Sequence, residues 1–374
     1  MDAVLTAMVE DKIGPGEQSR LLIQIAREYL QYDYCFALRS PAIALYWALS
    51  ALNPEDGQGV VLSALAPRYC GQVLRELRLT PVYADAAPGS AVISPETINA
   101  AIDRKPEGVV VRCILASHTL GYVPDMPAIA QLGLPVIEDC SQSYGTMIGA
   151  ARAGSFGVFT ILGLEEHDML TSGGGALLYA VNRRDAAVLR NQEPPLPEYS
   201  LPDLNAAMAV VQFKEYNRNS EKRREIAQAY TQSALRTRHK RFVQPEIADP
   251  GALGSESGAA DSVLAAQSDA ASEGVNGASQ NAVRENSGEQ NTVEYNNYAF
   301  PLILETGMKD VKAYAKRKDI AVESAFEDTL VGSIPPELCP EAYSLSLRTA
   351  LFPLYPRLGA AEIGKVAKLI MTLP

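Results

Sequence analysis

The sequence of 374 residues lacks the features that would place it in several large classes of protein. Lysine and arginine total 33 against 44 acidic residues, for a net charge of -11, whereas a nucleic-acid-binding protein needs clustered cations to neutralise phosphates. No apolar run is long enough to span a bilayer, and residues 1–17 have neither the charged nor the apolar region of a secretion signal. We therefore expect a cytoplasmic protein that binds neither nucleic acid nor membrane.

Cysteine pairs and lysine are missing where chemistry would use them. The five cysteines are scattered and form no Cys-x-x-Cys pair, which argues against a disulfide scaffold and against a zinc site. No lysine occurs between Lys105 and Lys214. This gap contains the stretch ILGLEEHDMLTSGGGALLY (residues 161–179), whose glycine triplet before an apolar run looks like one wall of a cofactor pocket.

What the sequence does contain, from about residue 36 onward, is an alternation of helical and strand patterns. Apolar β-branched runs separated by amphipathic helices predict an α/β fold with a largely parallel sheet covered by helices on both faces. Ligands of such sheets lie beyond the carboxyl ends of the strands. The predicted strands are 59–65, 80–85, 108–117 and 134–139, and the predicted helices are 40–52, 68–77, 93–104 and 126–133.

The second half of the chain predicts a separate, smaller unit. Residues 203–235 have the pattern of one or two long helices, which end a large domain (1–235) and lead to a small C-terminal α/β domain (236–374). Within the latter, residues of about 245–294 are rich in Ala, Ser, Gly, Asn and Glu and have no aromatic residue. Such a composition cannot offset its ordering entropy, so we expect a disordered insertion there.

Three residues at or near predicted strand and helix ends are candidates for binding. Asp139 ends the apolar strand of VIEDCSQSYG (136–145), where a carboxylate can pair with the protonated ring nitrogen of pyridoxal phosphate, and Gln142 could reach the phenolic oxygen of that ring. A strand-terminal Asp is at least as often a helix cap or turn residue. Ser40 could present a helix N-terminus to an anion, but Pro41 has no N–H, which favours a simple N-cap.

These pieces, in this order, resemble the DegT/DnrJ/EryC1/StrS family of pyridoxal-phosphate-dependent sugar aminotransferases. The resemblance implies an aspartate aminotransferase-like fold, nucleotide sugars as substrates in amino-sugar and polysaccharide metabolism, and a homodimer with its active site at the interface. The matching segments are GPG (14–16), RSPAIALYWAL (39–49), SHTLGYVPDM (117–126), VIEDCSQSYG, GSFG (154–157), EYSLPDLNAAMAVVQF (198–213), KRREIAQAY (222–230) and FPLYPRLGAAEIGKV (352–366).

The sequence departs from this family where the cofactor would be held. Members carry a Schiff-base lysine after the GSFG element, but counting back from the glycine triplet gives His167 and counting forward from GSFG gives Asp168. The family's phosphate-binding Ser, which precedes that lysine, is unmatched, because residues 161–164 stand in its place. The family's Ser-Gly-Thr element is Ser-Pro-Ala here, with only Ser40 retained. The aromatic residue that stacks on the ring, expected after Ser63, finds only Ala and Pro nearby.

Three hypotheses follow from these departures. The first is a non-catalytic binding or assembly homologue, paired with a copy of itself or with an active paralogue. The second is a nucleotide-sugar 3-dehydratase, in which His167 acts as the base on a cofactor held without a covalent bond. The third is an active aminotransferase that uses another lysine. Lys214 and Lys222 could be that lysine only if they reached the site, but both have the pattern of solvated helix residues. We favour the first, and expect a structural hydrogen bond at His118 and a tight turn at the glycine triplet.

Overall fold

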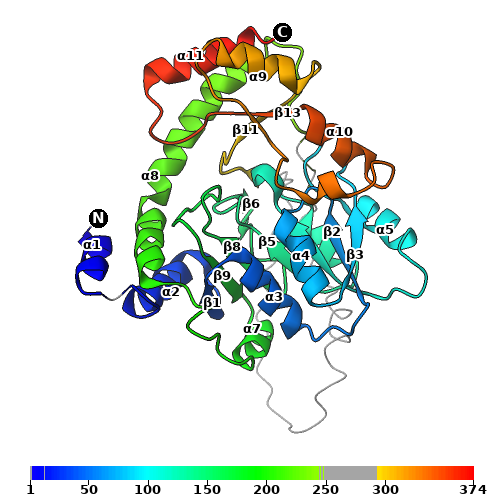
Figure 1. Ribbon diagram of the computed structural model, residues 1–374, viewed down its shortest axis with the longest axis vertical. Coiled ribbons are helices and arrows are strands. Elements are labelled where there is room, and N and C mark those ends of the chain that lie inside the picture. The colour runs from blue at the N-terminus through cyan, green and yellow to red at the C-terminus, as the bar shows by residue number, and fades with distance from the viewer. Residues whose placement is uncertain (1, 12, 244, 246, 248–292) are drawn as a thin grey trace, which may run out of the picture.

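A computed structural model describes residues 2–11, 13–243, 245, 247 and 293–374 of the chain (Figure 1). The insertion predicted at about residues 245–294 falls almost entirely outside the described residues. Among the helices that are described, none combines the length and the apolarity needed to cross a bilayer.

A seven-stranded sheet forms the centre of the molecule, in the order β1-β9-β8-β5-β4-β2-β3. The pairs β2–β3, β2–β4, β4–β5 and β5–β8 are parallel, and only β9 runs antiparallel to its neighbours. The prediction of a mostly parallel α/β sheet is therefore confirmed. The strands are β1 (Tyr34–Leu38), β2 (Gly59–Ser63), β3 (Thr80–Ala84), β4 (Val111–Ser117), β5 (Val136–Asp139), β8 (Phe159–Gly163) and β9 (Ala176–Ala180).

Helices cover both faces of this sheet because alternate strand residues point to opposite sides. In β2, Val60 and Leu62 belong to the apolar cluster on one face, and Val61 belongs to a cluster on the other. The first face is covered by α3 (Pro41–Ala51), α4 (Arg68–Glu76) and α7 (Arg183–Arg190). The second is covered by α2 (Glu17–Leu30), α5 (Pro95–Asp103), α6 (Met126–Ala130) and the first half of α8 (Asp203–Ala234).

The C-terminal part builds a second, smaller sheet. Strands β11 (Phe300–Ile303), β13 (Thr349–Phe352) and β12 (Glu323–Ser324) pack with α9 (Met308–Lys316), α11 (Ala360–Met371) and the second half of α8. Figure 1 shows α8 extending from the large sheet to this layer. Yet Phe326, Leu330 and the helix α10 (Pro340–Arg348) contribute to the apolar cluster of the large sheet. The boundary at residue 235/236 remains a prediction.

Small elements complete the described chain. Strands β6 (Met147–Ile148) and β7 (Ala151–Arg152) form a hairpin, and β10 (Val293–Glu294) adds to β6. Helix α1 (Asp2–Val9) precedes α2, and short 3₁₀ turns lie at Thr119–Gly121 (η1) and Leu330–Ser333 (η5).

Two of the sequence motifs act as scaffold. Asp203, at the start of α8, accepts hydrogen bonds from the backbone N–H of Gly16 (2.8 Å) and of Ser19 (2.9 Å), and from the hydroxyl of Ser19 (2.7 Å). Burial alone would raise the pKa of Asp203, but these hydrogen bonds outweigh it and lower the pKa. In the VIEDCSQSYG motif, Gly145 has φ +81, and a Cβ on this residue would lie 1.8 Å from the hydroxyl of Tyr216. The backbone conformation and the close tyrosine therefore both require glycine at this position.

Candidate functional site

A cavity of about 770 Å³ lies at the carboxyl end of the sheet. Its walls come from the ends of β4 and β5, from the loop after β8, from the start of α4, and from residues 323–329 of the C-terminal part. This is the edge at which parallel sheets bind ligands. Of the candidate residues, the cavity brings together Asp139, Gln142 and His167, and it also includes Asp168, but Ser40 does not line it.

Both carboxylate oxygens of Asp139 are already engaged by the chain itself. Oδ1 accepts hydrogen bonds from the backbone N–H (3.1 Å) and the hydroxyl (2.5 Å) of Ser141, and Oδ2 accepts one from the phenol of Tyr69 (3.3 Å). The hydroxyl of Ser141 in turn accepts from the N–H of Gly163 (2.8 Å). Burial raises the pKa of Asp139, although these hydrogen bonds lower it. Asp139 is therefore anchored between β5 and β8.

Gln142 holds the neighbouring loop together. Its side-chain oxygen accepts a hydrogen bond from the backbone N–H of Leu120 (2.6 Å), and its backbone carbonyl accepts one from the side-chain amide of Asn296 (2.7 Å). Leu120 has φ +57 within η1, a left-handed conformation that costs energy in a bulky residue. The side-chain oxygen of Gln142, the residue predicted to reach the phenolic oxygen of the cofactor ring, is thus used to hold this strained turn.

Ser40 is the N-cap of α3, as the sequence predicts from the proline that follows it. Its hydroxyl accepts a hydrogen bond from the backbone N–H of Ile43 (3.3 Å), and Pro41 is the first helical residue. Pro41 faces the cavity without an N–H to offer to an anion.

The loop after β8 decides which residue enters the cavity. His167 is exposed, and its backbone carbonyl accepts a hydrogen bond from the phenol of Tyr298. Asp168 is half-buried, and its Oδ2 accepts a hydrogen bond from the N–H of Glu165 (2.8 Å). A Cβ on Gly163 would lie 2.2 Å from that same oxygen, so the Asp168 carboxylate lies directly over the glycine.

The environment of Asp168 is acidic. Burial, followed by the nearby charges of Asp139 and Glu165, raises its pKa to about 7, although the N–H of Glu165 opposes the shift. The carboxylate of Asp168 thus lies at the end of β8, next to Asp139, in the region where the resemblance expects a lysine amine.

His118 and Glu138, near the ends of β4 and β5, have structural roles. His118 Nδ1 lies 2.5 Å from the hydroxyl of Ser143, which confirms the predicted hydrogen bond, and burial lowers the pKa of His118 to about 3. Glu138 is fully buried and accepts hydrogen bonds from the backbone N–H groups of the GSFG element, Gly154, Phe156 and Gly157. The GSFG motif is therefore a loop held by a carboxylate.

Comparison with known proteins now identifies the chain. Residues 1–256 match the family model described as the DegT/DnrJ/EryC1/StrS aminotransferase family. The chain belongs to this family.

The relatives and structural neighbours agree with this membership. An L-glutamine:2-deoxy-scyllo-inosose aminotransferase from Streptomyces lividus is 29% identical over 48% of this chain and 42% of its own length. A GDP-perosamine synthase from Vibrio cholerae is 24% identical over 54% of this chain and 59% of its own length. The matched region thus spans about half the length of these curated relatives. The structure of a DegT DnrJ EryC1 StrS aminotransferase from Brucella abortus superposes with a TM-score of 0.77 and 17% identity. The match covers 99% of this chain and 93% of the Brucella abortus chain.

The glycine triplet of this family member forms the predicted tight turn. Gly173, Gly174 and Gly175 have φ values of +72, +129 and +128, which side chains rarely adopt. The N–H of Leu164 donates to the carbonyl of Gly175 (2.8 Å), which brings the loop back into β9. The turn needs no ligand.

Beyond the Ala and Pro that follow Ser63, an aromatic residue does reach the cavity. Tyr69 lies six residues on, in the first turn of α4, where it lines the cavity and donates to Asp139. Tyr298 and Phe326 also line the cavity and were missed. Phe326 and Tyr298 gave no local signal, because the C-terminal part meets the sheet only through the tertiary fold. Tyr69 did have a local signal, because it is the second residue of the predicted helix 68–77 and follows Ser63 by only six residues.

No lysine is among the described residues that line the cavity. Lys214 and Lys222 are exposed on α8, and Lys222 pairs with Glu225 (2.7 Å). An adjoining cavity of about 520 Å³, which shares His167 and Asp168 with the first, is lined by Lys365 of α11.

Proposed function

We propose that this protein is a member of the sugar aminotransferase family that does not transaminate and serves as a ligand-binding or assembly homologue in nucleotide-sugar metabolism. The observation that carries the proposal is the position of Asp168. A carboxylate, rather than an amine, lies over Gly163 and beside Asp139. Covalent attachment of pyridoxal phosphate requires an amine nucleophile, and a carboxylate cannot form that bond.

Other residues in and around the cavity also argue against a covalently bound cofactor. A pyridine nitrogen at Oδ2 of Asp139 would share this oxygen with the phenol of Tyr69. At the N-terminus of α3, Pro41 offers no N–H to a phosphate, and the hydroxyl of Ser40 already caps the helix. Carboxylates of Glu165 and Asp168 would repel a phosphate dianion. The residues present do not fit a covalently held pyridoxal phosphate.

Family membership supports a proposal for the pathway and the assembly state. Relatives include a GDP-perosamine synthase and aminotransferases for 2-deoxy-scyllo-inosose, so we assign the pathway to amino sugars or related cyclitols. We also propose a cytoplasmic homodimer, or a pair with an active paralogue.

The test is a titration of the purified protein with pyridoxal phosphate, followed by absorption and then by borohydride reduction and mass spectrometry. We expect no saturable visible band and no covalent adduct. A band that borohydride fixes to a lysine overturns the proposal, and the modified peptide identifies the residue, with Lys365 the first to inspect. A saturable, non-covalent change that disappears in His167→Ala, but persists in Glu166→Ala, would instead support the dehydratase.

A further inference from the structure

One partition separates the two cavities. The cavity of about 770 Å³ and the adjoining cavity of about 520 Å³ are both lined by residues of the loop after β8 and by residues of the C-terminal part. The shared residues are His167 and Asp168 from the loop, and Tyr298, Glu323 and Leu351 from the C-terminal part. The loop and the C-terminal part therefore meet between the two cavities.

A single hydrogen bond joins the two sides of this partition. The phenol of Tyr298 donates to the backbone carbonyl of His167. In the part of the chain that the structure describes, no other hydrogen bond or ion pair connects residues 164–175 with residues 293–374. The polar contact across the partition therefore depends on one hydroxyl group.

Tyr298 is the fixed side of this contact. Its backbone N–H donates to Oδ1 of Asn296 (3.0 Å), and its carbonyl accepts from the guanidinium of Arg223 (2.7 Å). The side-chain amide of Asn296 donates in turn to the carbonyls of Gln142 (2.7 Å) and Tyr144 (3.0 Å). The backbone that carries the phenol is thus held by contacts that do not involve the hydroxyl.

The loop is anchored on both of its limbs. The N–H of Leu164 donates to the carbonyl of Gly175 (2.8 Å), and the N–H of Met169 donates to the carbonyl of Ser141 (3.1 Å). The side chain of Met169 is also buried in an apolar cluster. Movement within the loop is therefore confined to residues 165–168, which we call the gate turn.

The gate turn has few contacts of its own. The N–H of Asp168 donates to the carbonyl of Glu165 (3.1 Å), and the N–H of Glu165 donates to Oδ2 of Asp168 (2.8 Å). Between them, Glu166 and His167 are exposed. An exposed turn with few buried contacts opens at a free energy well below that of global unfolding.

We propose that the gate turn is a gate between the two cavities, latched by the phenol of Tyr298. In the closed form, which the structure shows, the cavities are separate compartments. In the open form, His167 and Asp168 withdraw and the compartments become one cleft. Each compartment alone has the volume of a single small-molecule pocket, so the open form admits a longer ligand than either compartment does. The inference is independent of the proposed function, since it concerns the chain without ligand or cofactor.

The experiment is hydrogen–deuterium exchange of the full chain, resolved to single amides by mass spectrometry, in the parent protein and in Tyr298→Phe. The substitution removes the phenol hydroxyl and keeps the backbone contacts of residue 298. We expect the amides of Glu165 and Asp168 to exchange about fivefold faster in Tyr298→Phe, the effect of one lost hydrogen bond on the opening equilibrium. The amides of Met169 and Ser172, which are bonded within the anchored limb, should exchange as in the parent protein.

Two variants serve as controls. His167→Ala should leave the exchange of Asp168 unchanged, because the latch uses only the backbone carbonyl of residue 167. Tyr343→Phe, at an exposed tyrosine of α10, should also have no effect.

Unchanged exchange of Glu165 and Asp168 in Tyr298→Phe overturns the inference. So does an equal acceleration at Met169 and Ser172, because the whole loop would then unfold as one unit. Faster exchange of Leu304, whose N–H donates to the carbonyl of Arg348 (2.8 Å), would likewise overturn it, since the substitution would then loosen the C-terminal part. None of these results bears on the pyridoxal phosphate titration, so failure of the gate is distinct from failure of the proposed function.

Discussion

Gly163→Ala tests directly whether the Asp168 carboxylate occupies the end of β8. The new Cβ would lie 2.2 Å from Oδ2 of Asp168 and 2.8 Å from the hydroxyl of Ser141. To escape this clash, Asp168 must give up the hydrogen bond from the N–H of Glu165, which is worth about 1.5–3 kcal/mol for a charged acceptor. Overpacking against Ser141 adds to this, so we expect the free energy of unfolding to fall by about 3 kcal/mol.

The cause can be isolated with a double-mutant cycle measured by urea unfolding. In an Asp168→Ala background, the clash at 2.2 Å is absent, so Gly163→Ala should cost about 1.5–2 kcal/mol less than in the parent protein. Gly364→Ala is the matched control, because a Cβ there meets no atom within 4 Å in the middle of α11 and should stabilise the helix by about 0.5–1 kcal/mol. If Gly163→Ala is as stable as the parent, or the two changes are additive, Asp168 does not lie over Gly163 and the argument for an occupied lysine position fails.

Three further outcomes follow from the same contacts. Burial and acidic neighbours raise the pKa of Asp168 to about 7 from an ordinary 3.8. The contribution of Asp168 to stability is therefore full below about pH 4 and is lost as the pH rises through 7. Thermal unfolding at pH 5, 6, 7 and 8 should show that the melting temperature declines less steeply with pH in Asp168→Asn than in the parent. Asp203→Ala should lower the free energy of unfolding by about 3 kcal/mol, because it leaves the N–H and hydroxyl donors of residues 16–19 without an acceptor. An unchanged midpoint of urea unfolding would contradict the scaffold role of Asp203. Tyr69→Phe should lower it by about 1 kcal/mol through loss of the hydrogen bond to Asp139, whereas Tyr343→Phe, at an exposed tyrosine, should be neutral in the same assay.

The fold could be predicted from local pattern because the inner strands β2, β5 and β8 of the sheet are buried on both faces. A continuous run such as VIED or GVVLS, flanked by amphipathic helices, admits few other architectures. The single antiparallel strand β9 could not be predicted in the same way, because reversal of one strand leaves its apolar pattern unchanged. Direction is decided by the turn at Gly173–Gly175, and the sequence there indicates a turn without indicating where it leads.

The site was harder to predict, because the family motifs mix two kinds of residue. The aspartate of the LPDLNAA motif and the glutamate of VIED are well matched in sequence, but Asp203 and Glu138 both hold backbone N–H groups and neither lines the cavity. Gln142 likewise supports a turn. Asp139 was placed correctly at the sheet edge. Its partner Tyr69, and the position of the Asp168 carboxylate over Gly163, depend on loop conformations that spacing alone does not fix.

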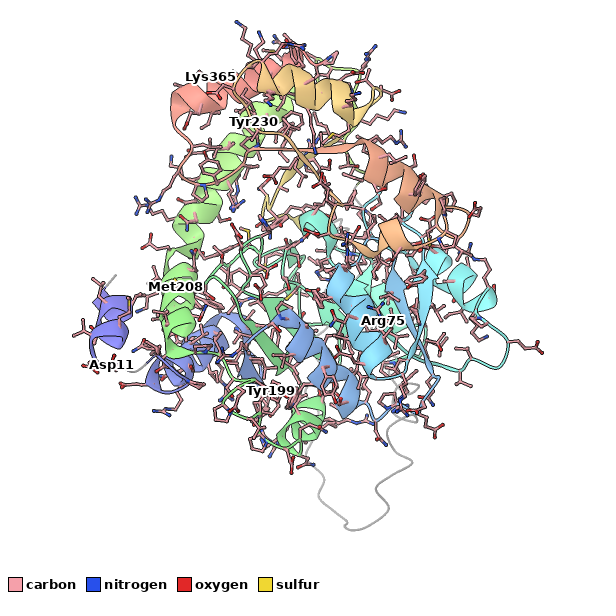
Figure 2. All side chains as sticks on the ribbon, viewed as in Figure 1. Asp11, Arg75, Tyr199, Met208, Tyr230 and Lys365 are labelled. Atoms are coloured by element: carbon pink, nitrogen blue, oxygen red, sulfur yellow. The ribbon has the colours of Figure 1, made fainter. Side chains whose placement is uncertain are left out.

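Helix α8 gives the cavity a mechanical connection to distant parts of the chain. Its 32 residues form a rod of roughly 48 Å at 1.5 Å per residue. One end is fixed through Asp203, and the far half packs against the small sheet (Figures 1 and 2). Between them, the guanidinium of Arg223 donates to the backbone carbonyls of Tyr298 (2.7 Å) and Leu354 (3.0 Å). Tyr298 borders both cavities, so a tilt of α8 would move one wall of each cavity. A displacement of the N-terminal segment would therefore change the width of both cavities.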